Sequence, residues 1–271
     1  MQKTSYQNEL SISAVQKRGG SNSKKDVLKI QSWLTLYDLA NPGSGTTTGI
    51  DGDFGPATER SVMKFQNINA LPATGIVDPD VFTKLCSSLA TAFVTPLTGN
   101  GLRELIVNAA SQHLSSRPYE LTIKGESNSG PWVRSYMNGH EGESWFWCMG
   151  FVQTIVDQAA SSLNKDFKTL MPLTFSCDTV GTTGLSNGNL TRYNKIRNDP
   201  SLAQPGDIFL IQKSSTDWYH TGIITSVEED IFETIEGNTN NDGSHNGNRV
   251  CGRTRNFMVS KLDVFSVEPL V

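Results

Sequence analysis

The 271-residue sequence lacks several features that would place it in a large class of proteins. No run of apolar residues approaches the roughly 18 that a membrane-spanning helix needs, so we expect no membrane insertion. The N-terminus has no apolar core of the kind that a secretory signal carries, and we expect synthesis in the cytoplasm without a signal peptide. A formal net charge of −4 disfavours a nucleic-acid partner, which usually meets a basic patch.

Cysteine and histidine are both scarce, with four of each in the chain. The cysteines are far apart and form no C-x-x-C pair, so the sequence predicts neither a zinc site nor a disulfide framework. A disulfide among them is not expected in a chain without a signal peptide. We therefore expect no metal and no cofactor.

Helical spacing is the main pattern of the first 92 residues. Apolar residues recur at helical intervals over residues 27–37 and again over 62–68. A third helix is predicted after Asp78, an N-cap residue that precedes Pro79 in the first turn. The sequence thus predicts a small bundle of three short helices. The stretch FVTPLTGNG that follows is rich in Pro, Gly, Thr and Asn, which is typical of a linker.

Four motifs of this region resemble the peptidoglycan-binding-type-1 family of three-helix wall-binding modules. They are VLKIQSWL, GIDGDFGPATERSVMKFQ, LPATGIVD and VFTKL, and they occur in the family's order over about residues 14–92. The resemblance implies binding to bacterial peptidoglycan. We expect a peptidoglycan-binding domain over residues 1–92 and a linker over 93–101.

One cysteine, Cys148, stands directly before an amphipathic helix. In SWFWCMGFVQTIVDQA, the apolar residues Val152, Ile155 and Val156 follow it at helical spacing. Free cysteines are among the most buried residue types, so a structural role is the ordinary interpretation. A helix N-terminus, however, can lower a thiol pKa from about 8.5 to roughly 3.5–7.5. This position makes Cys148 the candidate nucleophile.

His220 is the candidate base for this nucleophile. It opens HTGIITSV, whose β-branched residues are typical of a strand. The other three histidines, His113, His140 and His245, lie in polar surroundings that indicate surface or loop positions.

A β-hairpin would bring an acidic residue to His220. If the turn EED is centred on Glu229, paired residues have numbers that sum to 458, and Gly222 faces Glu236. Glu236 and Asn238 then share a face with His220, and Glu236 lies diagonal to it and within reach. A slip of one residue would move His220 to the opposite face. Taken alone, Glu236 would be interpreted as a solvent-facing carboxylate.

The second part of the chain, about residues 102–271, resembles the cysteine, histidine-dependent amidohydrolase/peptidase (CHAP) family of papain-like wall hydrolases. The motifs GESNSGPWVRSYM, WFWCMGFV, QPGDIFLI, HTGII and TIEGNTN occur in the family's order. The resemblance implies Cys148 as nucleophile, His220 as general base and Glu236 as the residue that orients the imidazole. Asn238 matches a polar residue that the family often keeps beside it, and which of the two acceptors orients the ring stays open.

The two resemblances together imply an α+β protein, with a small three-helix bundle linked to a papain-like domain of helices packed on an antiparallel sheet. The expected function is cleavage of amide bonds in peptidoglycan, as an amidase or endopeptidase, at the cell wall or in the periplasm. The alternatives are a catalytically inactive wall-binding protein and a cysteine protease of protein substrates.

Delivery to the wall without a signal peptide would fit a phage endolysin or an injected antibacterial effector, and an effector would have a dedicated inhibitor (immunity) protein. We expect a monomer.

The tryptophans are interpreted as mainly core residues, with the additional hypothesis that Trp147 or Trp218 lines the groove that holds a peptide stem.

Overall fold

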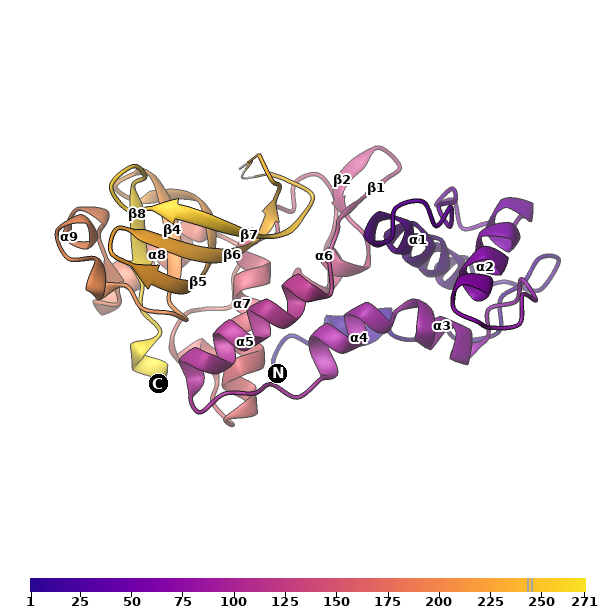
Figure 1. Cartoon of the computed structure of the whole chain (residues 1–271), viewed down its shortest axis with the longest axis horizontal. Helices are drawn as coiled ribbons and strands as arrows, with labels where there is room; N and C mark the ends of the chain where they lie inside the picture. The colour runs from indigo at the N-terminus through magenta and orange to yellow at the C-terminus, as the bar shows by residue number, and fades with distance from the viewer. Residues whose placement is uncertain (243, 245) are drawn as a thin grey trace. The chain divides into compact units, whose positions relative to one another are not determined.

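The computed structural model describes every residue of the chain except 243 and 245. It combines helices with antiparallel strands (Figure 1), which confirms the predicted α+β class. The chain divides into two compact units. Unit 1 consists of Met1–Thr4, Ala92–Pro118 and Ser144–Val271, and unit 2 consists of Ser5–Thr91 and Tyr119–Glu143. Within the described part of the chain, no helix has both the length and the apolar character needed to cross a membrane.

Unit 2 is built mainly from helices. Its elements are η1 (Ser5–Glu9), α1 (Lys24–Ala40), α2 (Pro56–Ile68), α3 (Pro79–Leu85), the start of α4 (Ser87–Val94), β1 (Leu121–Ile123), β2 (Glu126–Ser129) and α6 (Pro131–Tyr136). As predicted, Asp78 caps α3, and its carboxylate accepts a 2.9 Å hydrogen bond from the Val81 backbone N–H. The predicted third helix is interrupted at Cys86, and α4 continues through Val94 into the stretch expected to be a linker.

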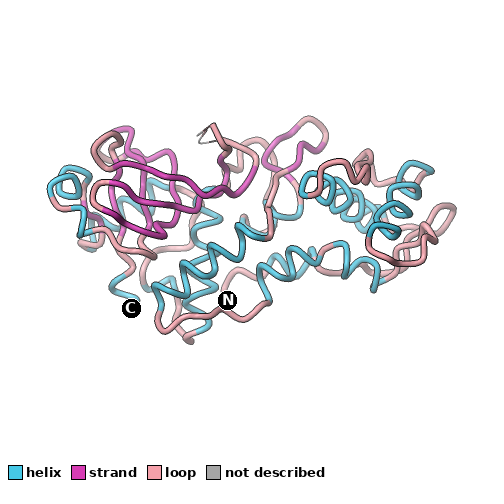
Figure 2. Tube along the Cα trace, in the orientation of Figure 1, coloured by secondary structure: helices cyan, strands magenta, loops and turns pink. Residues whose placement is uncertain are grey.

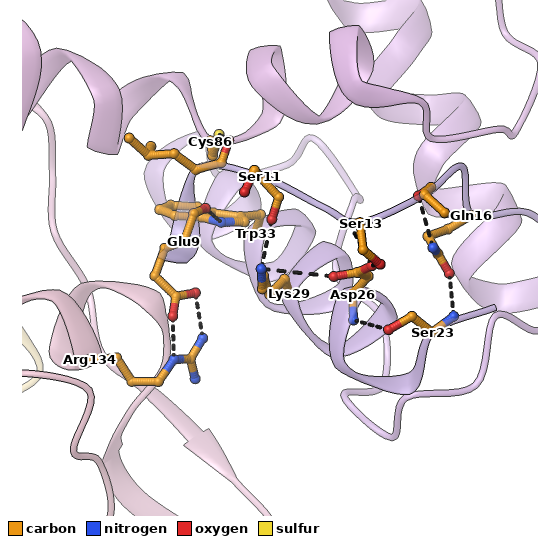
Figure 3. A network of polar contacts seen from close by, with 12 residues as sticks. Glu9, Ser11, Ser13, Gln16, Ser23, Asp26, Lys29, Trp33, Cys86 and Arg134 are labelled. Atoms are coloured by element: carbon orange, nitrogen blue, oxygen red, sulfur yellow. Dashed lines mark hydrogen bonds and ion pairs between the residues drawn. The ribbon is translucent and has the colours of Figure 1, made fainter. Parts of the chain in front are cut away.

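The segment Tyr119–Glu143 packs with the N-terminal helices in unit 2. Trp132 of α6 makes an edge-to-face contact with Trp33 of α1, with ring centroids 6.2 Å apart. Arg134 donates two 2.8 Å hydrogen bonds to the carboxylate of Glu9, within the polar network drawn in Figure 3. Unit 2 therefore joins residues that are far apart in the sequence, and the motif GESNSGPWVRSYM lies within it.

A six-stranded antiparallel sheet forms the centre of unit 1 (Figure 2), with the strand order β3-β8-β4-β5-β6-β7. The strands are β3 (Leu190–Thr191), β4 (Ile208–Ser214), β5 (Asp217–Glu228), β6 (Ile231–Thr239), β7 (Arg249–Asn256) and β8 (Leu262–Phe265). The helices are α5 (Leu102–Ser115), α7 (Cys148–Ser162), α8 (Cys177–Asn187) and α9 (Tyr193–Asn198), with the 3-10 turns η2 (Phe167–Thr169), η3 (Pro200–Leu202) and η4 (Glu268–Leu270).

Strands β5 and β6 form the predicted hairpin. Ile223 pairs with Ile235 and Ile224 with Thr234, so the residue numbers sum to 458 as predicted. The pairing shifts by one residue between Ile224 and Ser226, towards the turn. Near the candidate site the predicted register is therefore confirmed, and the irregularity is confined to the far end of the hairpin.

Helix α7 is the central helix of unit 1. All of its residues from Cys148 to Ala160 are buried, and it packs against both β5 and β6. The first residues of the chain also join this unit, because the backbone N–H of Lys3 donates a 2.8 Å hydrogen bond to Asp157 of α7. A helix that is buried all round provides a rigid support for the residue at its start.

Candidate active site

Cys148 is the first residue of α7, as the sequence predicts. Its side chain is buried, at 4% exposure, and the backbone N–H of Met149 helps to lower the pKa of its thiol. The sulfur thus lies where the free N–H groups and the positive end of the helix dipole favour a thiolate.

The start of α7 is fixed on β6 by a close approach at Gly237. A Cβ atom added to Gly237 would lie 2.6 Å from the Cβ of Phe151 and 3.0 Å from the ring of Trp147. Phe151 lies one turn after Cys148 in α7, and Trp147 comes directly before Cys148. Glycine is therefore needed between Glu236 and Asn238 to let the helix start come this close to the sheet.

His220 lies on β5, paired with Ile211 of β4. Its Nε2 is 2.8 Å from Oε2 of Glu236, and both side chains are buried. Glycine at position 222 leaves room for the Glu236 side chain, because a Cβ there would lie 2.7 Å from the Cγ of Glu236. The predicted diagonal contact between His220 and Glu236 is present, and Glu236 is not the solvent-facing carboxylate that it would be in isolation.

Both oxygens of Glu236 are held by further donors. Arg255 of β7 donates from Nε to Oε1 at 2.5 Å and from Nη2 to Oε2 at 2.6 Å. The hydroxyl of Thr234 donates to Oε1 at 2.6 Å. Burial raises the pKa of Glu236, but the hydrogen bonds from His220 and Arg255 outweigh it and lower that pKa to about 2. The carboxylate is therefore ionised and fixed in orientation.

The imidazole of His220 joins this carboxylate to the cysteine. His220 and Cys148 lie close enough that each shifts the pKa of the other. The buried Nδ1 of His220 makes no hydrogen bond within the described part of the chain, which leaves that atom available to the sulfur. Burial lowers the pKa of His220, but the interactions with Cys148 and Glu236 outweigh it and raise the pKa to about 9.

Cys177, the first residue of α8, is a second thiol at the site that sequence analysis missed. Its interaction with Cys148 is the largest influence lowering the pKa of Cys148; burial opposes this effect, and His220 lowers the pKa further, to well below its usual value. The same interaction and burial raise the pKa of Cys177 well above its usual value. These shifts favour a thiolate at Cys148 and a thiol at Cys177, beside an imidazolium at His220.

The remaining predicted site residues are all buried. Asn238, two residues after Glu236, is fully buried with a φ of 56°, and its carbonyl accepts a 3.0 Å bond from Gly247. Trp147 and Trp218 are 0% and 3% exposed, and the indole of Trp218 donates to Asp263 at 2.9 Å. Both rings are packed in the interior, as expected of core residues, and a role of either tryptophan in a substrate groove stays a hypothesis.

The interpretation of His113 as a surface or loop residue is wrong. His113 lies in α5, is fully buried, and has its Nε2 3.1 Å from Oε1 of Gln158 on α7. Burial lowers its pKa to about 4, although the bond to Gln158 opposes the shift. His140 is exposed, as expected, and His245 lies outside the described residues. Among the described residues, no group of three or more His, Cys, Asp or Glu is placed to hold a metal ion.

Comparison with known proteins concerns the helical part of the chain. A family model described as a peptidoglycan binding domain matches residues 23–85, which agrees with the module expected over about 14–92. Among curated proteins, the zinc D-Ala-D-Ala carboxypeptidase of Streptomyces albus G is 48% identical over 52 residues, which make up 19% of this chain and 20% of that protein. The chain thus matches about a fifth of that relative's length. No solved structure gives a significant match.

The family match supports peptidoglycan as a partner and a function related to the bacterial cell wall. It covers residues of α1, α2 and α3 and none of the site residues described above.

Proposed function

We propose that this protein is a peptidoglycan hydrolase, which cleaves an amide bond of the cell wall through Cys148, His220 and Glu236 and binds the wall through its helical module. The observation that carries the proposal is the series of interacting groups from the sulfur at the start of α7, through the imidazole, to the buried carboxylate that is hydrogen-bonded to the ring. Thiol, imidazole and an orienting acceptor in this order are what nucleophilic acyl transfer requires.

In this mechanism the Cys148 thiolate attacks the carbonyl carbon of the amide. The Cys148 backbone N–H, at the helix start, stabilises the developing oxyanion. The His220 imidazolium gives its proton to the leaving amine, and the neutral ring then takes a proton from the water that releases the acyl group. Glu236, held by Arg255 and Thr234, keeps the ring in one orientation through both steps.

The binding module is proposed to keep the hydrolase on its insoluble substrate. A module that stays on the polymer raises the local concentration of cleavable bonds at the active site, without a new contact to the bond itself. The substrate class is an amide of peptidoglycan, either the bond that joins sugar to peptide or one within the peptide or cross-bridge. Mass spectrometry of the released fragments identifies which.

A Cys148→Ala variant tests the proposal. Purified peptidoglycan should release new amine ends with the parent protein and none with the variant. Both should sediment equally with the insoluble wall, because the family match lies at residues 23–85. Cys251→Ala is the matched control, since Cys251 is also a buried free cysteine but lies on β7. Equal release by parent and Cys148→Ala would remove Cys148 from the mechanism.

The same assay separates the two alternatives. A wall-binding protein without activity would sediment with the wall and release no amine ends even as the parent. A cysteine protease of protein substrates would digest casein in parallel reactions and leave peptidoglycan intact.

The way in which the enzyme reaches the wall is a separate part of the proposal. A phage endolysin would lyse cells from within once it is released. An injected effector would be neutralised by a dedicated immunity protein. Expression of the protein in the periplasm of a test bacterium, with and without the neighbouring gene product, distinguishes the two.

A further inference from the structure

The two thiols Cys148 and Cys177 occupy equivalent places in unit 1, each as the first residue of a helix that packs on β5. Both are buried and both are free, and their side chains lie close enough that each shifts the pKa of the other. The proposed hydrolysis uses the sulfur of Cys148 only. Cys177 is therefore a nucleophilic group at the site to which the mechanism gives no role.

Contacts of α8 with β5 hold Cys177 in this position. The carboxylate of Asp178 accepts a 2.6 Å hydrogen bond from the backbone N–H of Trp218. One turn along the helix from Cys177, a Cβ added to Gly181 would lie 2.5 Å from the Trp218 ring, so the helix lies directly on that side chain. Trp218 stands two residues before His220. The start of α8 is thus fixed on the strand that carries His220, as the start of α7 is fixed at Gly237.

The pair carries the two forms that disulfide chemistry requires. Cys148, with its lowered pKa, is the thiolate, and a thiolate is the form that reacts with an oxidant. Cys177, with its raised pKa, is the thiol held against it. Redox-sensitive cysteines are typically thiolates with such a neighbouring cysteine.

We propose that Cys177 is a resolving cysteine, which closes a reversible disulfide with Cys148 when a peroxide oxidises the site. The Cys148 thiolate attacks one oxygen of hydrogen peroxide, the O–O bond breaks, and the departing hydroxide takes up a proton to give water and a sulfenic acid. Cys177 then loses its proton and attacks the sulfenic sulfur; the S–O bond breaks and a second water leaves. The two sulfurs are oxidised together by two electrons, and the peroxide is reduced.

The consequence for function rests on the proposed hydrolase mechanism. A disulfide removes the nucleophile, so wall hydrolysis stops until a thiol reductant restores both cysteines. It also protects the nucleophile, because a sulfenic acid that has been captured as a disulfide does not proceed to the irreversible sulfinic acid.

The test is oxidation of the whole chain with hydrogen peroxide, followed by mass spectrometry. The parent should lose the mass of two hydrogen atoms, yield a cross-linked peptide containing Cys148 and Cys177, and return to its original mass with dithiothreitol. Cys177→Ser should instead gain oxygen at Cys148 and stay oxidised in dithiothreitol. Cys251→Ser is the matched control, because Cys251 has the same 7% exposure as Cys177, and it should behave as the parent does.

Sulfinic acid at Cys148 in the parent, with Cys177 still open to alkylation, would overturn the proposal, as would the absence of any change at either sulfur. These readouts need no wall substrate. If Cys148→Ala still cleaved peptidoglycan, the proposed function would fail, although the parent protein could still form the cross-link between Cys148 and Cys177. If the parent cleaved peptidoglycan but formed no cross-link, only the resolving role would fail.

Discussion

At the scale of single residues, Arg255 is the partner on which the orienting carboxylate depends. It places a guanidinium on both oxygens of Glu236, and the carboxylate is fully buried. Removing one partner from a buried ion pair is strongly destabilising, by about 3–5 kcal/mol, because the other charge is left uncompensated. In the proposed mechanism, Arg255 is therefore a positioning residue that acts on His220 through Glu236.

Substitution of Arg255 by methionine is predicted to weaken catalysis and to change its pH dependence. The pKa of Glu236 should rise from about 2, since Arg255 no longer lowers it. The acid limb of the pH profile of wall hydrolysis should consequently move to higher pH. Arg255→Lys should restore part of the activity. Arg253→Met is the control from the same strand, since Arg253 donates to the Asn240 carbonyl; an equal shift in that variant would contradict the role of Arg255.

His220 sets the alkaline limit of the proposed reaction. Its pKa is raised to about 9, so the imidazolium that protonates the leaving amine is present below that pH and is lost above it. Hydrolysis is predicted to fall as the pH rises through about 9. The same charge stabilises the folded state. This contribution is fully present below pH 6.5 and is lost as the pH rises from 6.5 through about 9. If the rate of hydrolysis instead declined near pH 6.5, the raised pKa of His220 and its ion pair with Glu236 would be contradicted.

The residues of the site differ in how far sequence could predict them. Cys148 is marked by the helix that follows it, and Glu236 by the hairpin register, because both signals are local. Arg255 and Cys177 carry no such signal. The partner of Arg255, Glu236, lies on the neighbouring strand β6, and the partner of Cys177, Cys148, lies on a different helix, α7. His113 was misassigned because its polar neighbours in the sequence lie on other sides of α5, whereas the ring itself faces Gln158 of α7.

At the scale of elements, the contact between α7 and β6 fixes the position of Cys148, the proposed nucleophile. Gly237→Ala is predicted to lower the stability by about 1–3 kcal/mol, because the new methyl group would overlap Phe151 and Trp147 in a packed core. Wall hydrolysis should decline as well, since the start of α7 must shift. Thermal unfolding and amine release measure the two effects.

Gly252→Ala on β7 is the matched control for this substitution. The nearest atom to its added Cβ would be 3.7 Å away, an ordinary contact. If both alanine variants unfolded at the parent's temperature with full activity, the close approach of α7 to β6 would not matter for the site.

The contact between α5 and α7 contributes a pH dependence of stability. His113 is buried with a pKa of about 4, below the usual 6.5, so the unfolded chain binds a proton more readily than the folded one. Stability is predicted to fall as the pH drops from 6.5 towards 4, with a slope of at most about 1.4 kcal/mol per pH unit from this group. His113→Gln should reduce the slope measured by denaturant unfolding. His140→Gln, at an exposed position, should leave it unchanged.

Local elements were the most predictable part of the fold. The helices α1, α2 and α3 and the hairpin β5–β6 follow from periodicity, capping and turn residues. The break at Cys86, where α3 ends and α4 begins, has no comparable sequence signal, because the apolar spacing continues across it.

At the scale of the whole molecule, sequence pattern does not show which distant segments pack together. The ion pair between Glu9 and Arg134 joins residues 125 positions apart, and no periodicity marks it. The predicted limits of 1–92, 93–101 and 102–271 treat Tyr119–Glu143 as part of the second domain, whereas this segment packs in unit 2. The limits of the functional domains stay a prediction, with a wall-binding match inside the first.

In the proposed mechanism, wall hydrolysis passes through a covalent intermediate on the sulfur of Cys148. The most direct measurement is mass spectrometry of the protein quenched in acid while it digests soluble peptidoglycan fragments. We predict a fragment joined as a thioester to the peptide that contains Cys148, and neither adduct nor release in a His220→Asn variant, because the imidazolium must protonate the leaving amine. Hydrolysis that proceeds with no adduct at Cys148, and at the parent's rate in Cys148→Ser, would contradict this mechanism.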